Sequence, residues 1–422
     1  MASTYLTRTN SVSSSTYTFS AWVKHTAVGV NDYKTLCLFG TDQDASSTMS
    51  LSINNTDKWN VYNGSGHTSS NAVARDSSGW YNVVLKVDNL SGTIYVNNES
   101  VLTGITCKAT GTVSNHMIVG AYGASGNEDY WNGLMSHVHF IDGTAYDATA
   151  FGEYDANGVW TIIAEPSVTY GTNGFFILKD GNSVTDQSGN SNNFTVAGGT
   201  LTNTEDCPDN VFATMNPLAQ TLSGITYSGG NTISTMTGDV GQRQSISTLG
   251  MPSGKFYMEC KLQAVGSTGG SFPYAGIVAQ EKYDADTYVG SNGTGWVSSG
   301  DIYNGGSNSS TGVSYTTGDI IGLAVDIDNS KLYWHKNGTY ILSGNPSTGA
   351  NGYDISARTA EGTLGFGVSS WNNNGIWQAN FGNGYFGTTA VASAGTNASG
   401  IGIFEYDVPT GYTALSTKGL NL

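Results

Sequence analysis

The sequence predicts an all-β fold built from two antiparallel β-sandwich domains in tandem. Short apolar runs that alternate with polar residues are separated by stretches rich in Gly, Ser, Thr and Asn, a pattern typical of many short strands joined by tight turns. Glycine accounts for 57 of the 422 residues, nearly twice the usual share of about 7%. The length also fits two domains better than one, because single domains commonly run to roughly 100–200 residues.

The clearest strand of the first half covers residues 17–24, where apolar and polar positions alternate. Its odd-numbered positions are Tyr17, Phe19, Ala21 and Val23, and its even-numbered positions are Thr18, Ser20, Trp22 and Lys24. This alternation predicts a half-buried strand, with the odd-numbered side chains in the core of the sandwich and the even-numbered side chains on its outer surface.

A β-hairpin of the same plan is predicted in each half. In the first half, residues 80–87 alternate, turn through residues 88–92 and return as residues 93–96. In the second half, residues 318–325 are related in the same way to residues 331–335. The turns are rich in Asp, Asn, Ser and Gly, the residues that such connections favour. Two copies of one hairpin plan indicate two sandwiches of related build.

The domain boundary is predicted near residue 215. Residues 202–210 form a polar stretch that contains a proline and has no apolar period, which is typical of a connection between domains. We therefore assign residues 1–215 to the first sandwich, which includes a C-terminal extension, and residues 216–422 to the second.

Charged residues make up 11% of the chain, against about 25% in typical domains, so we expect a surface of Ser, Thr, Asn and Gly. The net charge of −16 repels phosphate backbones and excludes nucleic acid as a direct partner. No run of about 18 apolar residues occurs, so membrane insertion is not expected. The first residues lack the basic and apolar regions of a signal peptide, and we expect synthesis in the cytoplasm without standard export.

Four blocks of the first half carry a family resemblance. They are YTFSAWVK at 17–24, WYNVVLKVD at 80–88, IYVNN at 94–98 and WNGLMSHVHFIDG at 131–143. With these blocks, residues 1–215 resemble the laminin-G-like, concanavalin-A-like modules that are common in structural proteins of marine and cyanobacterial phages. The resemblance implies a jelly-roll sandwich and a place on a virion.

The second half resembles a SPRY domain, because several separated blocks stand in the order of that family. They are SGKFYMECKL at 253–262, GIVAQ at 276–280, GDIIGLAVDIDNSKLYWHKNG at 318–338, LGFGVSS at 364–370 and WQANFG at 377–382. The resemblance implies a second concanavalin-A-like sandwich, and animal SPRY domains bind proteins through their loops. The pairing of the two modules points to a phage protein by analogy.

Concanavalin-A-like sandwiches also include laminarinase-type glucanases, whose Glu-x-Asp-x-x-Glu pattern turns two carboxylates toward one cleft. Glu153 and Glu405 are each followed by Asp two residues later, but Gly158 and Thr410 stand where the second glutamate is needed. The sequence therefore predicts that the protein is not an enzyme. A carboxylate pair assembled from different strands remains the open alternative.

Asp42 and Asp44 are candidate calcium ligands in the first domain. They alternate like the oxygen ligands of a calcium loop, and laminin-G-like domains often bind calcium. The alternative is that both residues only initiate a turn. Apart from calcium we expect no cofactor, since the four cysteines lack CxxC spacing and predict neither a zinc site nor a disulfide scaffold.

Aromatic side chains are the candidates for glycan recognition, since sugar rings stack on indole and phenol faces. Trp59, Trp296 and Trp371 stand among Asn, Gly and Ser, which places them on loops. We predict these three as glycan-binding residues, with a structural role for each as the alternative.

Together these observations predict a virion surface protein of a bacteriophage, such as a capsid decoration, a head fibre or a tail appendage. We expect it to contact other virion proteins, as a homo-oligomer or in repeated copies on the particle, and to bind a host-surface glycan or receptor weakly during host attachment. We expect synthesis in the host cytoplasm and a final location in the virion. The alternative is a glycan-active hydrolase or a free carbohydrate-binding lectin of the same fold.

Overall fold

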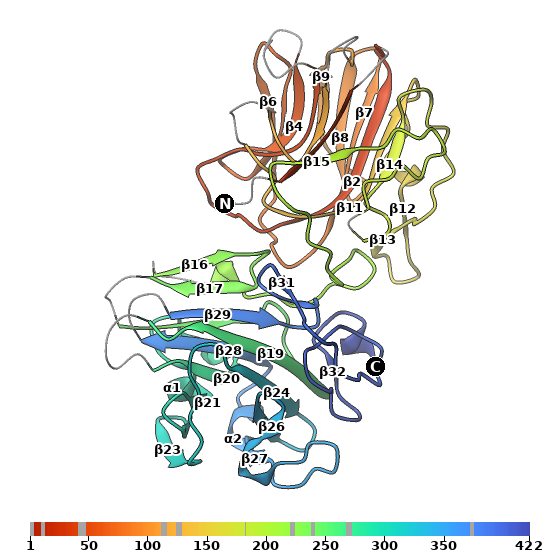
Figure 1. Ribbon diagram of the computed structural model, residues 1–422. Helices are drawn as coiled ribbons and strands as arrows, with labels where there is room; N and C mark the ends of the chain where they lie inside the picture. The colour runs from red at the N-terminus through yellow and green to blue at the C-terminus, as the bar shows by residue number, and fades with distance from the viewer. Residues whose placement is uncertain are drawn as a thin grey trace. The chain divides into compact units, whose positions relative to one another are not determined.

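The structure is a computed structural model that describes residues 4–9, 13–40, 48–110, 116–123, 129–181, 183–219, 224–237, 241–266, 272–371 and 375–422. The chain divides into two compact units, Met1–Asn203 and Thr204–Leu422. Both consist of mainly antiparallel sheets with short helical turns (Figure 1). The prediction of an all-β fold is confirmed.

The division between the units falls between Asn203 and Thr204, whereas the sequence predicts it near residue 215. Phe212 gives the physical reason. Its side chain is buried, and its backbone pairs with that of Ser416 near the end of the chain. The apolar residues that follow the polar stretch thus already belong to the core of the second unit.

In the described part of the chain, the first unit contains two large sheets. Sheet 1 has the order β15 (Thr195–Ala197), β1 (Tyr5–Thr9), β10 (His116–Val119), β3 (Lys34–Gly40), β4 (Met49–Ile53), β5 (Lys58–Tyr62) and β6 (His67–Val73). Sheet 2 has the order β14 (Phe175–Ile177), β11 (Gly133–Asp142), β2 (Tyr17–His25), β7 (Tyr81–Asp88), β8 (Ser91–Val96) and β9 (Glu99–Thr106). The turn η1 (Ala148–Ala150) and the hairpin of β12 (Gly152–Tyr154) and β13 (Trp160–Ile162) follow β11.

The core of the first unit lies between sheets 1 and 2 and is built by every second residue of their strands. It includes Met49, Leu51 and Ile53 of β4, Trp59 and Val61 of β5, and Val83, Leu85 and Val87 of β7. This alternation leaves the intervening residues of β4 and β5 on the outer face of sheet 1, where the candidate site lies.

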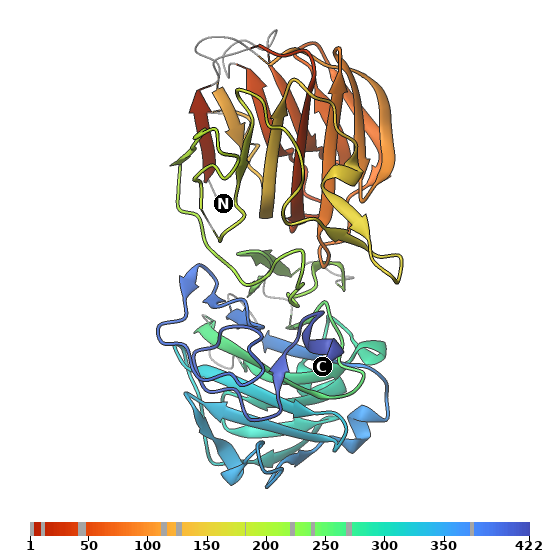
Figure 2. The ribbon, with the colours of Figure 1, turned by 90° about the vertical axis from the view of Figure 1, so that its right-hand side faces the viewer.

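Strand β2 departs from the predicted pattern, because all nine of its residues are buried. Its odd-numbered side chains face the core as predicted. Its even-numbered face is covered by the segment after β11, where the hydroxyl of Thr18 donates to the carbonyl of Thr144 at 2.9 Å and Phe151 packs with Ile141. The prediction of a half-buried strand is wrong, because this third layer, seen in yellow against sheet 2 in Figure 2, shields β2 from water.

The second unit also contains two large sheets among the residues that the structure describes. Sheet 3 has the order β16 (Ile225–Ser228), β17 (Ile233–Met236), β29 (Gly375–Asn380), β19 (Lys255–Ala264), β24 (Ile320–Asp326), β25 (Lys331–Lys336) and β26 (Thr339–Tyr340), with β27 (Tyr353–Asp354) beside β25 and β32 (Thr413–Ala414) beside β19. Sheet 4 has the order β18 (Gln242–Ile246), β28 (Leu364–Trp371), β20 (Tyr274–Ala279), β21 (Gly293–Val297), β22 (Asp301–Asn304) and β23 (Ser307–Ser310).

The core of the second unit holds the buried indoles of Trp296, Trp334 and Trp377. Short elements lie at its periphery. They are β30 (Tyr385–Phe386), β31 (Thr389–Ala390), α1 (Val289–Asn292), α2 (Ser356–Thr359), η2 (Pro217–Ala219), η3 (Gln280–Lys282), η4 (Ile341–Ser343) and η5 (Gly419–Asn421). Helix α1 covers the outer face of sheet 4, where Val289 packs with Val278 and Tyr274.

Both predicted hairpins are confirmed. β7 pairs with β8 in the first unit, and β24 pairs with β25 in the second. The first hairpin turns through Asn89 and Leu90, whose φ angles of 46° and 66° lie in the left-handed region. Two such residues in succession form the tight connection whose twist matches that of the flanking strands.

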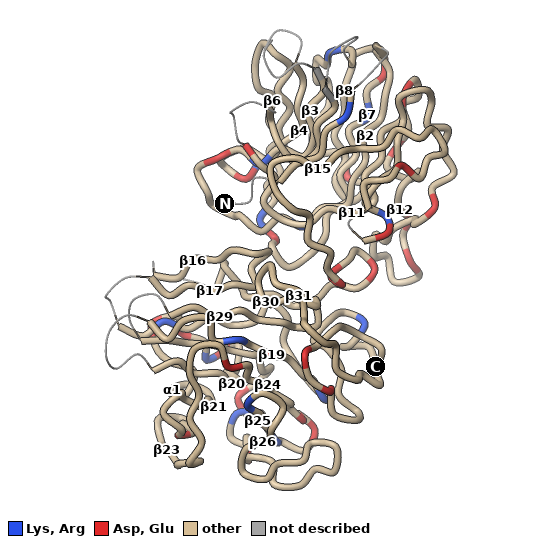
Figure 3. Tube along the Cα trace, in the orientation of Figure 1, with Lys and Arg blue, Asp and Glu red and all other residues tan. Residues whose placement is uncertain are grey.

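Charged residues are sparse along both units, and most of the trace in Figure 3 carries none. Among the described residues, no helix has the length and apolar character that crossing a membrane requires.

All four cysteines are free. Cys37, Cys107 and Cys260 are buried and Cys207 is half-buried. Burial raises the pKa of each thiol, to about 12 for Cys107.

Candidate functional site

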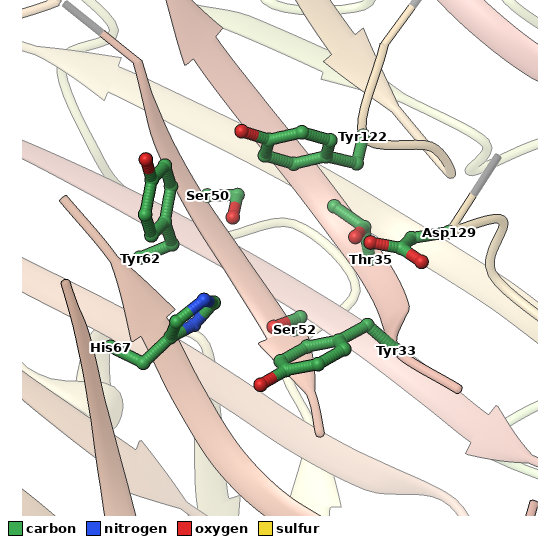
Figure 4. Close-up of a pocket in the computed structure, with 8 residues that line it drawn as sticks. All are labelled: Tyr33, Thr35, Ser50, Ser52, Tyr62, His67, Tyr122 and Asp129. Atoms are coloured by element: carbon green, nitrogen blue, oxygen red, sulfur yellow. The ribbon is translucent and has the colours of Figure 1, made fainter. Parts of the chain in front are cut away.

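A hollow of about 260 Å³ lies on the outer face of sheet 1. It is lined by residues of β3 to β6 and of the segments beside β3 and β10, namely Tyr33, Thr35, Ser50, Ser52, Tyr62, His67, Tyr122 and Asp129. Figure 4 shows Ser50 and Ser52 between the aromatic rings. The lining thus combines hydroxyl groups, aromatic faces and a carboxylate.

Strand alternation creates the floor of the hollow. Because Met49 and Leu51 point into the core, Ser50 and Ser52 point to the opposite face of β4. Thr35 of β3 pairs in register with Ser52, so its side chain lies beside these serines. All three side chains are buried at the base of the hollow, and their small size leaves the space above them open.

Four aromatic side chains of the lining form its wall. The ring centroids of Tyr33 and His67 lie 5.1 Å apart, and those of His67 and Tyr62 lie 4.8 Å apart. Tyr62 and His67 are direct cross-strand partners on β5 and β6, the arrangement that brings side chains of one face together. Tyr122 continues the row, with its ring centroid 6.0 Å from that of Tyr62.

A hydrogen-bond network through Asn60, on the neighbouring strand β5, orients His67. The side-chain amide nitrogen of Asn60 lies 3.2 Å from Nδ1 of His67 and donates to the hydroxyl of Ser52 at 3.0 Å. The hydroxyl of Ser69 donates to the amide oxygen of Asn60 at 3.0 Å. Burial lowers the pKa of His67, so the imidazole is neutral at physiological pH and presents an uncharged ring to the hollow.

Asp129 supplies the charge of the lining. Its backbone carbonyl accepts the N–H of Thr35 at 3.1 Å, which holds the Asp129 segment against β3. The pKa of Tyr122 is raised, first by burial and then by the nearby Tyr62 and Asp129. A negative charge beside the phenol disfavours the phenolate, so the Tyr122 side chain stays neutral at physiological pH.

A buried carboxylate, that of Asp57, fixes the segment before β3 that carries Tyr33. Asp57 is 1% exposed and accepts the backbone N–H of Gly29 at 3.1 and 3.2 Å from its two oxygens. Lys34 and Arg75 place their side-chain nitrogens 3.7 and 3.2 Å from the same carboxylate. Asp57 therefore ties the segment before β3 to the turn between β4 and β5.

A second group of ionisable side chains lies inside the second unit, around Glu259. Its carboxylate accepts the backbone N–H groups of Glu405 and Tyr406 at 2.8 Å each and the hydroxyl of Tyr257 at 2.9 Å. Burial raises the pKa of Glu259 to about 7, although these hydrogen bonds act in the opposite direction. The side chain is fully buried, so it holds the C-terminal segment to β19 and does not face solvent.

Two of the three predicted glycan-binding tryptophans lie in the cores. Trp59 of β5 is 1% exposed and Trp296 of β21 is 0% exposed. The loop assignment is wrong for both, because strand alternation turns their indoles inward. Trp371 ends β28 and is 42% exposed, so its role in glycan binding stays a prediction. Asp42 and Asp44, the candidate calcium ligands, lie outside the described residues.

The residues of the hollow are not among the predicted site residues, although the sequence carries part of the signal. In Lys58–Tyr62, Trp59 and Val61 alternate with Asn60 and Tyr62, which marks a strand with an aromatic residue on each face. Which outer face stays open could not be predicted, because it depends on segments distant in the sequence.

A laminin G family model, described as the concanavalin A-like lectin/glucanases superfamily, matches residues 2–149. The similarity therefore covers most of the first unit. No curated protein matched the chain.

Several solved structures are similar to the chain at low identity. The SPRY domain of human HERC1 is 18% identical and has a TM-score of 0.32, with 39% of this chain and 96% of that chain covered. A human SPRY domain is 16% identical, with a TM-score of 0.28 and 37% and 94% covered. The heptameric SAP-like pentraxin of Limulus polyphemus is 13% identical, with a TM-score of 0.28 and 34% and 72% covered.

Proposed function

We propose that the first unit binds carbohydrate in the hollow on sheet 1. The observation that carries the proposal is the row of aromatic side chains around a floor of hydroxyl groups (Figure 4). Sugars present apolar ring faces that stack on aromatic side chains, and hydroxyl groups that pair with serine and threonine. The match of residues 2–149 to a superfamily of lectins and glucanases supports the same ligand class.

The proposal is binding without hydrolysis. Most glycosidases use two carboxyl groups on either side of the scissile bond, about 5 to 10 Å apart. Among the described residues that line the hollow, Asp129 is the one with a carboxyl side chain. The hydrolase alternative would need a second carboxyl group within reach of Asp129.

Replacing Tyr33 or Tyr62 by Ala should weaken oligosaccharide binding by about fivefold to tenfold each, because each change removes one stacking face. The measurement is isothermal titration with oligosaccharides chosen from a glycan array. Tyr154→Ala is the matched control, since Tyr154 is a 50% exposed tyrosine on β12 that does not line the hollow.

Two outcomes would count against this proposal. If both hollow variants stay folded by circular dichroism and bind like the wild type, the glycan binds elsewhere, and Trp371 is the next candidate. If the wild-type protein binds no glycan on the array, the proposed function is wrong.

We further propose that the protein is a bacteriophage virion surface protein, present in repeated copies as a capsid decoration, head fibre or tail appendage. The support is the resemblance of the first module to those of phage structural proteins and, by analogy, its pairing with a SPRY-like module. Repeated copies would turn weak binding in each hollow into firm attachment to a host surface. Immunogold labelling of purified particles should find the protein on the virion, and label confined to the lysate of infected cells would exclude this role.

A further inference from the structure

We infer that Asn60, a buried residue that does not itself line the hollow, is a positioning residue of the carbohydrate site. Its amide holds His67 in the tautomer that carries the ring hydrogen on Nε2, and this N–H donates to an oxygen of the bound sugar. The inference rests on the proposed function and assigns the direction of two hydrogen bonds in the same site.

Asn60 is placed to act on two lining residues at once. Like Tyr62, it occupies an even-numbered position of β5, so its side chain lies on the outer face of sheet 1. Its amide nitrogen donates to the hydroxyl of Ser52 at 3.0 Å and lies 3.2 Å from Nδ1 of His67. Both of these partners line the hollow (Figure 4). A change at Asn60 therefore reaches the site through Ser52 and His67.

The direction of this network is set at Asn54. A backbone N–H group can only donate, and that of Lys58 reaches the amide oxygen of Asn54 at 3.0 Å. The amide nitrogen of Asn54 is therefore the group that donates to the hydroxyl of Ser69, at 3.1 Å. The hydroxyl of Ser69 donates in turn to the amide oxygen of Asn60 at 3.0 Å. Because its oxygen faces Ser69, Asn60 turns its NH₂ group toward His67.

The NH₂ group of Asn60 decides which nitrogen of His67 carries the hydrogen. An NH₂ group offers only hydrogens, so Nδ1 accepts and the hydrogen of the neutral imidazole lies on Nε2. Among the residues that the structure describes, Nε2 has no hydrogen-bond partner, which leaves its N–H for a ligand. The hydroxyl of Ser52 accepts from Asn60 and keeps its own hydrogen to donate. Both lining groups that Asn60 contacts thus present donors to sugar oxygens.

Asn60→Asp tests the inference, because a carboxylate of nearly the same shape accepts hydrogen bonds where the amide donates them. NMR of the imidazole nitrogens should find the neutral His67 of the wild-type protein protonated at Nε2. In Asn60→Asp the hydrogen should move to Nδ1, and the pKa of His67 should rise because a negative charge favours the imidazolium. Asn55→Asp is the matched control. It makes the same change in the turn between β4 and β5, where the side chain contacts Asn31, and should leave the tautomer unchanged.

Binding is measured by isothermal titration with tetramers of glucose, galactose, mannose and N-acetylglucosamine. The pH is held well above the pKa of His67 measured for each variant, so that the ring is neutral throughout. Asn60→Asp should weaken the tetramer that the wild-type protein binds best by about tenfold, because Nε2 no longer donates. Asn55→Asp should bind it like the wild type.

Ser69→Ala provides a second variant at an exposed position of β6, in case Asn60→Asp does not fold. It removes the donor that holds the amide oxygen of Asn60, so the amide can rotate and both tautomers of His67 should be found. Binding of the same tetramer should fall by about twofold to threefold.

A wild-type His67 that carries its hydrogen on Nδ1 would overturn the inference and leave carbohydrate binding intact. The same holds if Asn60→Asp stays folded by circular dichroism and binds the tetramer like the wild type. If only Ser69→Ala folds, an unchanged tautomer together with unchanged binding overturns the inference. If the wild-type protein binds none of the tetramers and no glycan on the array, the proposed function fails and the inference fails with it.

Discussion

The environment of each tryptophan differs with its position in a strand: Trp59 and Trp296 are buried, and Trp371 is exposed. Trp59 packs edge to face against Tyr81, with ring centroids 5.6 Å apart. Trp296 makes a similar contact with Tyr315 at 4.8 Å. Both indoles are enclosed by core side chains, so their removal would leave large cavities. Trp371 has 42% of its surface exposed and fills no such space.

Trp59→Ala and Trp296→Ala should each reduce the free energy of unfolding by about 3–5 kcal/mol, whereas Trp371→Ala should change it by no more than about 0.5 kcal/mol. Urea titration followed by far-ultraviolet circular dichroism measures all three. A loss for Trp371→Ala as large as that for Trp59→Ala would contradict its exposed position.

At the scale of the strand, features that depend on residues close in sequence could be predicted, and features that depend on distant segments could not. The two hairpins were predictable because the alternating residues and the turns of Asp, Asn, Ser and Gly act within a few residues of each other. The burial of both faces of β2 was not, since the covering layer around Phe151 comes from far along the chain. The hollow escaped prediction for the same reason, because Tyr33, Tyr62 and Asp129 meet only after sheet 1 has assembled.

At the scale of the whole molecule, the two units differ in the ionisable groups that they bury. In the first unit, burial lowers the pKa values of His25 and His137 to about 4. In the second unit, burial raises the pKa of Glu259 to about 7 and lowers that of His335 to about 3. The histidines stay neutral in the folded state, and Glu259 takes up a proton there more readily than in the unfolded chain.

Acid should therefore destabilise the first unit more than the second. Below the ordinary histidine pKa of 6.5, the unfolded chain binds protons that the folded unit excludes, so stability falls between about pH 6.5 and 4, with about 2 kcal/mol lost at His25 by pH 5. In the second unit, protonation of Glu259 below about pH 7 stabilises the folded state. This gain offsets the stability that is lost at His335. Thermal melts of residues 1–203 and 204–422, expressed separately across this range, test the difference.

His25→Gln in the first unit should make its stability less dependent on pH, because glutamine does not titrate. A melting temperature of residues 1–203 that stays constant from pH 7 to pH 5 would show that the buried histidines do not control the acid response.

The burial of the thiols allows the opening of each unit to be followed by chemical labelling. A thiol reacts as its thiolate, and burial keeps Cys37, Cys107 and Cys260 protonated and enclosed, while Cys207 at the start of the second unit is half-buried. A water-soluble maleimide would reach Cys207 first in the native protein and the others as each core opens. The mass added over time would record, without any engineered probe, which of the two units opens first.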